Sequence, residues 1–160
     1  MAANSHNPIV APICGLAHSG ITVTDMERSL AFYRDGLGLE VCIDRIANHD
    51  YLRALTAVNS SEVRIVFLRV PNSDASIELL EHRGIERVPV RPRPCDPGSA
   101  HLCLLVDDID TVHAGMAARG FLSRSGAPVT IDAGPFTGDR RCFLHDPDGF
   151  LIELSQPPKA

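Results

Sequence analysis

The sequence lacks three features that would each place it in a familiar class of protein. Its 160 residues contain no apolar run approaching the roughly 20 residues of a membrane-spanning helix, so we expect no membrane association. Acidic residues (20) outnumber basic ones (15), and the net charge of −5 makes nucleic acid a poor candidate partner. The five cysteines are an odd number without a C-x-x-C pair, which disfavours a disulfide framework and a thiolate zinc site.

A secretory leader and two common hydrolase motifs are also missing. Residues 1–7 carry no lysine or arginine, and Pro8 and Pro12 interrupt the apolar stretch that follows. Together with the unpaired cysteines, this absence predicts a cytoplasmic location. The sequence contains neither G-x-S-x-G nor H-E-x-x-H. What it does contain is a globular composition, 44% hydrophobic and 22% charged, with a mildly high count of seven histidines.

The chain repeats itself. Residues 17–26 (AHSGITVTDM) align without a gap with residues 100–109 (AHLCLLVDDI), and the tripeptide Ile-Glu-Leu recurs around Glu78 and Glu153. Each half thus has a histidine followed by a glutamate, 60 residues later in the first half and 52 in the second. The expected organisation is a tail (1–14) and a single domain (15–157), made of module one (15–83), a proline-rich linker (84–98) and module two (99–157).

Each module is predicted to have the order strand, helix and three strands, which makes the fold class α+β. The first helix follows Thr24, which forms a capping box with Glu27, and the second starts at Asp107 or Asp108. A short inserted helix is expected around Tyr51. In the first module the expected strands are 15–23, 39–46, 62–70 and 76–82. In the second they are 99–106, 121–125 with an extension through 129–131, 140–145 and 150–154.

The repeated histidines and glutamates are candidate metal ligands. Because side chains alternate along a strand, each of these residues faces away from its apolar neighbours. A carboxylate inside an apolar strand needs a partner, and two equivalent carboxylates would repel each other, so one divalent cation removes both problems. The candidate ligands are His18, Glu78, His101 and Glu153. Two imidazoles and two carboxylates suit nickel, cobalt, zinc, manganese or iron.

Taken one at a time, the same residues have a simpler interpretation. A histidine on a strand is usually a satisfied core residue or an exposed one. A glutamate within Ile-Glu-Leu usually lies on the solvent face of an antiparallel sheet. The recurrence of both residue types, in the same order and inside aligned segments, favours the metal site.

Two stretches of the chain resemble the signatures of a known family. Residues 32–41 (FYRDGLGLEV) resemble the helix-to-strand signature of the vicinal oxygen chelate superfamily, which includes glyoxalase I, methylmalonyl-CoA epimerase, extradiol dioxygenases and fosfomycin-resistance proteins. Residues 146–154 (DPDGFLIEL) resemble its carboxy-terminal signature, and the likeness covers about residues 15–157.

The resemblance implies two βαβββ modules that form one pseudo-symmetric, curved, eight-stranded sheet around a metal cavity. One ligand comes from each of the first, fourth, fifth and eighth strands. These positions correspond to the four candidate ligands His18, Glu78, His101 and Glu153. The resemblance also implies a homodimer, and some members share the site between subunits.

Three functions are compatible with this resemblance. The first is a metal-dependent isomerase, epimerase or lyase of glyoxalase type, which chelates two vicinal oxygens of a small organic substrate and stabilises an enediolate. Glu153, and after it Glu78, is the expected ligand that also acts as the base. The second is an iron(II) extradiol-type dioxygenase with a triad of His18, His101 and Glu153. The third is a non-catalytic drug-binding protein, which the presence of all four ligands disfavours.

Several other side chains are further candidates for a place near the site. Arg140 and Arg141 follow a glycine-containing loop and are candidates for contact with a substrate carboxylate. Cys103 shares a strand face with His101, and we expect it to be a small core residue. Four arginines near the linker could hold an anionic part of a substrate or could simply be solvated: Arg83, Arg87, Arg91 and Arg93.

Overall fold

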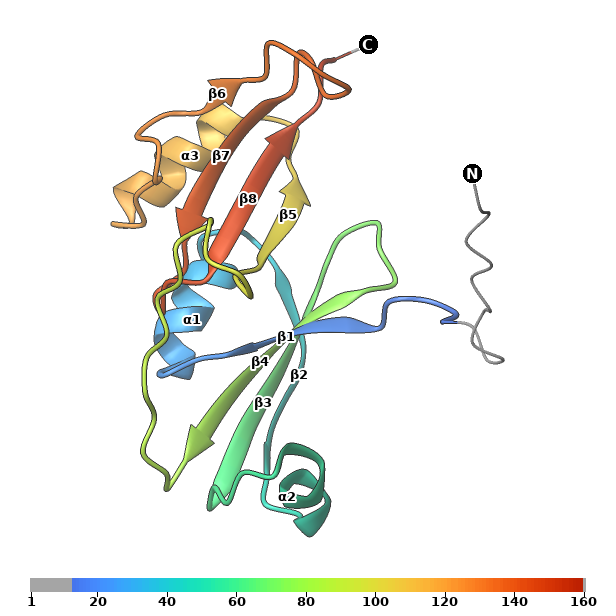
Figure 1. The fold of residues 1–160 in the computed structure, drawn as a ribbon, viewed down its shortest axis with the longest axis vertical. Helices are drawn as coiled ribbons and strands as arrows, with labels where there is room; N and C mark the ends of the chain where they lie inside the picture. Colours follow the sequence, from blue (N-terminus) through green and yellow to red (C-terminus); the bar gives the residue numbers. More distant parts are fainter. Residues whose placement is uncertain (1–12, 160) are drawn as a thin grey trace, which may run out of the picture.

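The computed structural model describes residues 13–159, so the expected tail over residues 1–14 lies almost entirely outside the described residues. Over the described part, the chain forms the strand-helix-three-strand order twice, which confirms the α+β class (Figure 1). The first module consists of β1 (His18–Thr22), α1 (Met26–Tyr33), β2 (Glu40–Ala47), α2 (Asp50–Thr56), β3 (Glu62–Arg69) and β4 (Ser76–Arg83). The second consists of β5 (His101–Leu105), α3 (Ile109–Ala118), β6 (Val129–Thr130), β7 (Arg140–His145) and β8 (Leu151–Gln156).

The strands form two four-stranded sheets with the same topology, β1-β4-β3-β2 and β5-β8-β7-β6. In each sheet the first strand of the module lies at an edge and runs parallel to the last, while the other pairs are antiparallel. The register also repeats, because Glu78 lies opposite Phe67 and Glu153 lies opposite Phe143. The expected single curved sheet is thus divided, over the described residues, into two equivalent sheets.

One face of each sheet is buried in a shared core. Ile77 and Leu79 of β4, and Ile152 and Leu154 of β8, belong to the same apolar cluster as the buried side chains of α1 and α3. Helix α1 lies between the two sheets in Figure 1, and its Phe32 ring meets the Phe121 ring of the second module edge-on at 5.0 Å. The opposite face of each sheet, which carries the predicted ligands, lies outside this core, although in the first sheet Val63 and Ile65 form a smaller buried cluster there with Leu52 of α2 packed against it. No helix within residues 13–159 is long and apolar enough to cross a membrane.

Two local predictions were wrong, and in both cases the reason is visible. The first helix is capped by Asp25, whose side chain accepts from the backbone N–H of Arg28 (3.0 Å), and not by Thr24. The backbone N–H and the hydroxyl of Thr24 instead both donate to Asp148, 124 residues away. The strand expected over 121–125 is reduced to one isolated bridge between Ser123 and Leu144, because the chain turns at residues 124–125, where the Gly126 N–H donates to the Ser123 carbonyl (3.3 Å).

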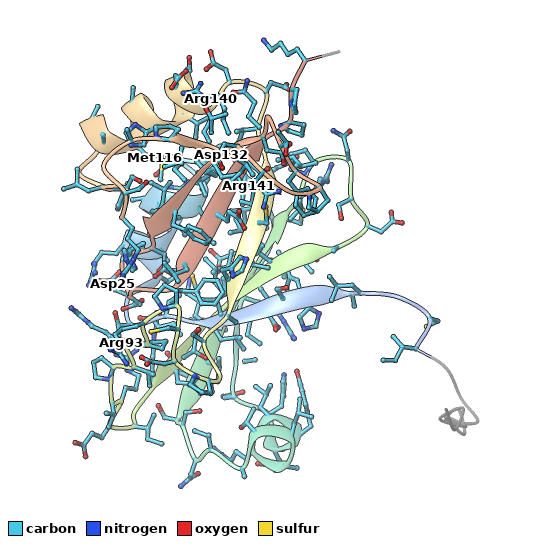
Figure 2. The ribbon with its side chains drawn as sticks, turned by 45° about the horizontal axis from the view of Figure 1, so that its top comes forward. Asp25, Arg93, Met116, Asp132, Arg140 and Arg141 are labelled. Atoms are coloured by element: carbon cyan, nitrogen blue, oxygen red, sulfur yellow. The ribbon has the colours of Figure 1, made fainter. Side chains whose placement is uncertain are left out.

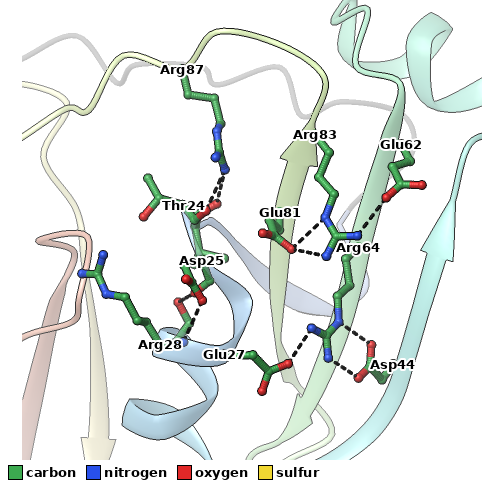
Figure 3. Close-up of polar contacts among 12 residues, drawn as sticks. Thr24, Asp25, Glu27, Arg28, Asp44, Glu62, Arg64, Glu81, Arg83 and Arg87 are labelled. Atoms are coloured by element: carbon green, nitrogen blue, oxygen red, sulfur yellow. Dashed lines mark hydrogen bonds and ion pairs between the residues drawn. The ribbon is translucent and has the colours of Figure 1, made fainter.

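Arginine side chains connect neighbouring elements of the first module (Figure 3). Arg64 of β3 pairs with Asp44 of β2 (2.8 Å) and with Glu27 of α1 (2.7 Å). This guanidinium holds the pKa of the Asp44 carboxyl below its usual value through a side-chain hydrogen bond. Helix α1 is thereby connected by charge to the face of the sheet on which it packs.

The two stretches that carry the family resemblance meet in the folded chain. The Tyr33 hydroxyl donates to Asp146 Oδ2 (2.9 Å), and both residues are buried. Asp146 also accepts from the backbone N–H groups of Asp148 and Phe150, which shapes the turn before β8. Burial raises the pKa of both Tyr33 and Asp146 above their usual values. The signatures thus hold the two modules together.

Replacing Tyr33 with phenylalanine is expected to lower the free energy of unfolding by about 1–3 kcal/mol, because it leaves the buried Asp146 without its side-chain donor. Chemical denaturation measures the change. Tyr51→Phe is the matched control, since the Tyr51 side chain is half exposed and its hydroxyl only accepts from Arg45. The control should change stability by no more than about 0.5 kcal/mol, and equal effects of the two variants would contradict the prediction.

A candidate metal centre in two halves

The first histidine–glutamate pair spans β1 and β4. His18 Nε2 lies 3.3 Å from Glu78 Oε2, and the two side chains are 43% and 16% exposed. The His18 ring also meets the ring of Phe67, on β3, edge-on at 5.5 Å. Strand alternation explains the arrangement, because the neighbours of Glu78 on either side point into the core.

The second pair repeats this geometry on β5 and β8. His101 Nε2 lies 3.2 Å from Glu153 Oε2, and the His101 ring meets the ring of Phe143, on β7, edge-on at 5.3 Å. The interplanar angles of the two histidine–phenylalanine contacts are 86° and 84°. The sequence repeat is therefore also a repeat of side-chain geometry. The two phenylalanines were missed by the sequence reasoning, although a recurring Phe-Leu pair at 67–68 and 143–144 was the available signal.

The predicted ligands come together as two pairs. Over residues 13–159, no group of three or more histidine, cysteine, aspartate or glutamate side chains lies close enough to hold one metal ion. His18 and Glu78 form one half, and His101 and Glu153 form the other. The spacing of each pair suits a metal. If two ligand atoms each lie about 2.1 Å from one ion and subtend an angle of roughly 100° at it, they lie about 3.2 Å from each other.

The second half contains an additional cation. Arg141 Nη1 donates to Glu153 Oε1 (3.0 Å), and Nη2 donates to Asp139 Oδ2 (2.8 Å). The guanidinium carbon lies 4.6 Å from the centre of the Phe136 ring. The adjacent Arg140 points to the other face, where it pairs with Asp110 of α3 (Figure 2). Of the two arginines that were candidates for substrate contact, only Arg141 belongs to the candidate site.

The other candidates from the sequence lie elsewhere or differ from expectation. Cys103 was predicted to be a core residue, which is wrong: it is exposed on the same face as His101. Three of the four arginines near the linker contact other residues of this chain. Arg83 pairs with Glu62 and Glu81, Arg87 donates to the carbonyl of Thr24, and Arg93 pairs with Asp96. These contacts support a structural interpretation of the arginines.

A cavity of about 510 Å³ lies between the end of β1, the linker and the start of β8. Its lining includes Thr22, Pro89 and Phe150, but none of the four predicted ligands. The His18 and His101 side chains, on the edge strands β1 and β5, are instead 43% and 49% exposed, whereas those of Glu78 and Glu153 are only 16% and 8% exposed. Within one chain, the two histidines are thus accessible from outside and the two glutamates are largely covered.

The paired βαβββ modules define a class of protein, and comparisons with known proteins give the same class. The chain belongs to the Glyoxalase/Bleomycin resistance protein/Dioxygenase superfamily, whose family model matches residues 15–154. A 2-epi-5-epi-valiolone epimerase from Actinomyces sp is 29% identical over 144 residues, covering 88% of this chain and 78% of the relative. A lactoylglutathione lyase from Salmonella typhimurium is 30% identical over 149 residues, covering 91% and 94% of the two chains.

The fold is also found among solved structures. A glyoxalase family protein from Bacillus cereus superposes with a TM-score of 0.75 at 18% identity, covering 94% of this chain and 98% of that one. The resemblance stated from the sequence is thus confirmed at the level of family and fold. The epimerase and lyase relatives support an enzyme of the isomerase or lyase kind within this superfamily.

Proposed function

We propose that this protein is a metal-dependent isomerase, epimerase or lyase of glyoxalase type, and that two chains together form each metal site. One observation carries the proposal. A single chain presents two histidine–glutamate pairs of equal geometry on two separate sheets, with nitrogen-to-oxygen distances of 3.3 and 3.2 Å and with both histidines exposed. Each pair is half of a four-ligand site, and the same chain supplies both halves.

A symmetric homodimer completes both sites at once. If the first sheet of one chain faces the second sheet of another, His18 and Glu78 of one chain meet His101 and Glu153 of the other. The two-fold axis then generates a second identical site. The same association covers the exposed histidines, which a metal site within a water-excluding cavity requires.

The chemistry follows from the donor set. One nickel, cobalt, zinc, manganese or iron ion held by these residues would supply Lewis-acid polarisation of two neighbouring oxygens on a small organic substrate. A glutamate of the set takes the acidic proton from the carbon next to those oxygens and returns it to a carbon of the product. Phe67 and Phe143, packed edge-on against the two histidines, hold the imidazoles in position and provide apolar walls.

The geometry favours this reaction class over the iron(II) dioxygenase. A dioxygenase triad uses His18, His101 and Glu153 and leaves Glu78 outside. Glu78, however, lies at the same distance from His18 as Glu153 does from His101, within 0.1 Å. A set of four such ligands is the one that non-redox chemistry uses. The presence of all four also favours a catalytic protein over a drug-binding one.

Removal of the metal provides the test. Treatment with a chelator is expected to abolish turnover of lactoylglutathione or of 2-epi-5-epi-valiolone, the compounds named for the relatives, and one divalent ion per chain should restore it. The reaction in heavy water should place deuterium in the product without oxygen uptake. Protein that binds no divalent ion, or that consumes oxygen during turnover, would contradict the proposal.

A further inference from the structure

The two halves of the candidate site differ in what surrounds the glutamate. Glu78 and Glu153 occupy the same register position, but their neighbours on the same sheet face are not equivalent. The first module has Ile65 two residues before Phe67, whereas the second has Arg141 two residues before Phe143. Opposite the glutamate on the edge strand, the first has Gly20 where the second has Cys103.

Glu153 is held on both of its oxygens. Its Oε1 accepts from Arg141 Nη1 (3.0 Å), so only Oε2, which faces His101, is available to a metal. The guanidinium is itself fixed by Asp139 (2.8 Å) and stacked on Phe136. Since the Glu153 side chain is only 8% exposed and that of Arg141 is 23% exposed, moving Glu153 would separate a partly buried ion pair.

Glu78 has far fewer constraints. Within residues 13–159, its only polar side-chain contact is with His18, and Ile65 offers no hydrogen bond. The adjacent Gly20 leaves room next to the carboxylate, because a Cβ built at that position would lie 3.5 Å from Glu78 Oε2. The Glu78 carboxylate can therefore rotate away from His18 without breaking a second interaction.

We propose that Arg141 is a positioning residue that holds Glu153 so that only one of its oxygens would be available to a metal ion, and that Glu78 is the carboxylate that transfers the substrate proton. Glu78 takes the proton from the substrate carbon, the electron pair stays on the substrate, and Glu78 then returns the proton to a carbon of the product. This inference rests on the proposed function and assigns different tasks to its two carboxylates.

Cobalt(II) affinity tests the role of Arg141 without any substrate. Isothermal calorimetry with Co²⁺ on the full chain should show that Arg141→Leu binds the ion about 10–100 times more weakly than the wild type. Arg141→Lys should recover part of the loss, because it restores the positive charge. Arg140→Leu is the matched control, since Arg140 pairs with Asp110 on the opposite face, and it should bind Co²⁺ as the wild type does. Circular dichroism verifies that each variant is folded.

The same measurement separates the two glutamates. Glu153→Gln should weaken Co²⁺ binding more than Glu78→Gln, and acetohydroxamate, a chelator with two neighbouring oxygens, should bind the cobalt form of Glu78→Gln at least as tightly as that of the wild type. The inference is overturned if Arg141→Leu binds Co²⁺ as tightly as the wild type or more tightly, since the guanidinium would then compete with the ion. A larger loss in Glu78→Gln would also overturn it. If the wild type binds no divalent ion, the proposed function itself fails.

Discussion

An equal mixture of His18→Ala and Glu153→Ala chains is expected to regain tight Co²⁺ binding that neither variant has alone. Each variant by itself lacks one ligand in every site. In a mixed dimer, one site lacks both ligands, but the other combines the intact first half of the Glu153→Ala chain with the intact second half of the His18→Ala chain. Random mixing makes about half of the dimers mixed, so about a quarter of all sites should be complete.

Coexpression or joint refolding prepares the mixture, and calorimetric counting of Co²⁺ per chain measures the recovery. The control mixes His18→Ala with Glu78→Ala, which affect the same half of the site, as the 3.3 Å contact between these side chains shows. No mixed dimer of this pair has a complete site, so no recovery is expected. Failure of the first mixture would mean that each chain builds its site alone, and equal recovery in the control would mean that the four ligands are not divided between the two halves in this way.

Glu78→Gln is expected to lower the turnover number by about 10²–10⁴-fold when Co²⁺ is saturating, because the amide cannot accept the substrate proton. The substitution keeps the size of the side chain and leaves the fixed half of the site, with Arg141 and Glu153, unchanged. Deuterium incorporation from heavy water into the substrate is the measurement that isolates the proton-transfer step.

Glu81→Gln is the matched control for this prediction. Glu81 belongs to the same strand, but strand alternation places it on the opposite face, where it pairs with Arg83 (2.8 Å). We expect its turnover to remain within about twofold of the wild type, because Glu81 contacts neither histidine–glutamate pair. The roles of the two carboxylates would be reversed if Glu78→Gln incorporated deuterium at the wild-type rate while cobalt-saturated Glu153→Gln incorporated none.

Strand periodicity accounts for most of what could be predicted. The alternation of apolar and ionisable residues around Glu78 and Glu153 is a property of consecutive residues, so it requires no knowledge of packing. The same parity would place Arg141, and not Arg140, on the face of Phe143 and Glu153, as the structure does. Strand β7 was predicted with its observed limits, Arg140–His145. Its short apolar run has ionisable residues on both sides, and these mark the two ends of the strand.

Contacts between distant residues decided the rest. Thr24 was predicted to cap the first helix, but its backbone N–H and its hydroxyl both donate to Asp148 of the second module. Nothing near Thr24 in the sequence indicates this long-range contact. The expected strand over 121–125 needed a partner along its whole length, and β7 offers it a single bridge. Cys103 is exposed because β5 lies at the edge of its sheet, whereas Glu153, opposite Cys103 on the inner strand β8, is buried.

The repeat, the α+β class, the family and the four ionisable residues on the two faces all follow from local spacing along the chain. The division of the four residues into two pairs, and the contact of Arg141 with one pair alone, follow from the packing of the modules. Spacing along a strand determines which way a side chain points, whereas the distance between two sheets, and the ion pair that reaches across strands, depend on how the modules pack.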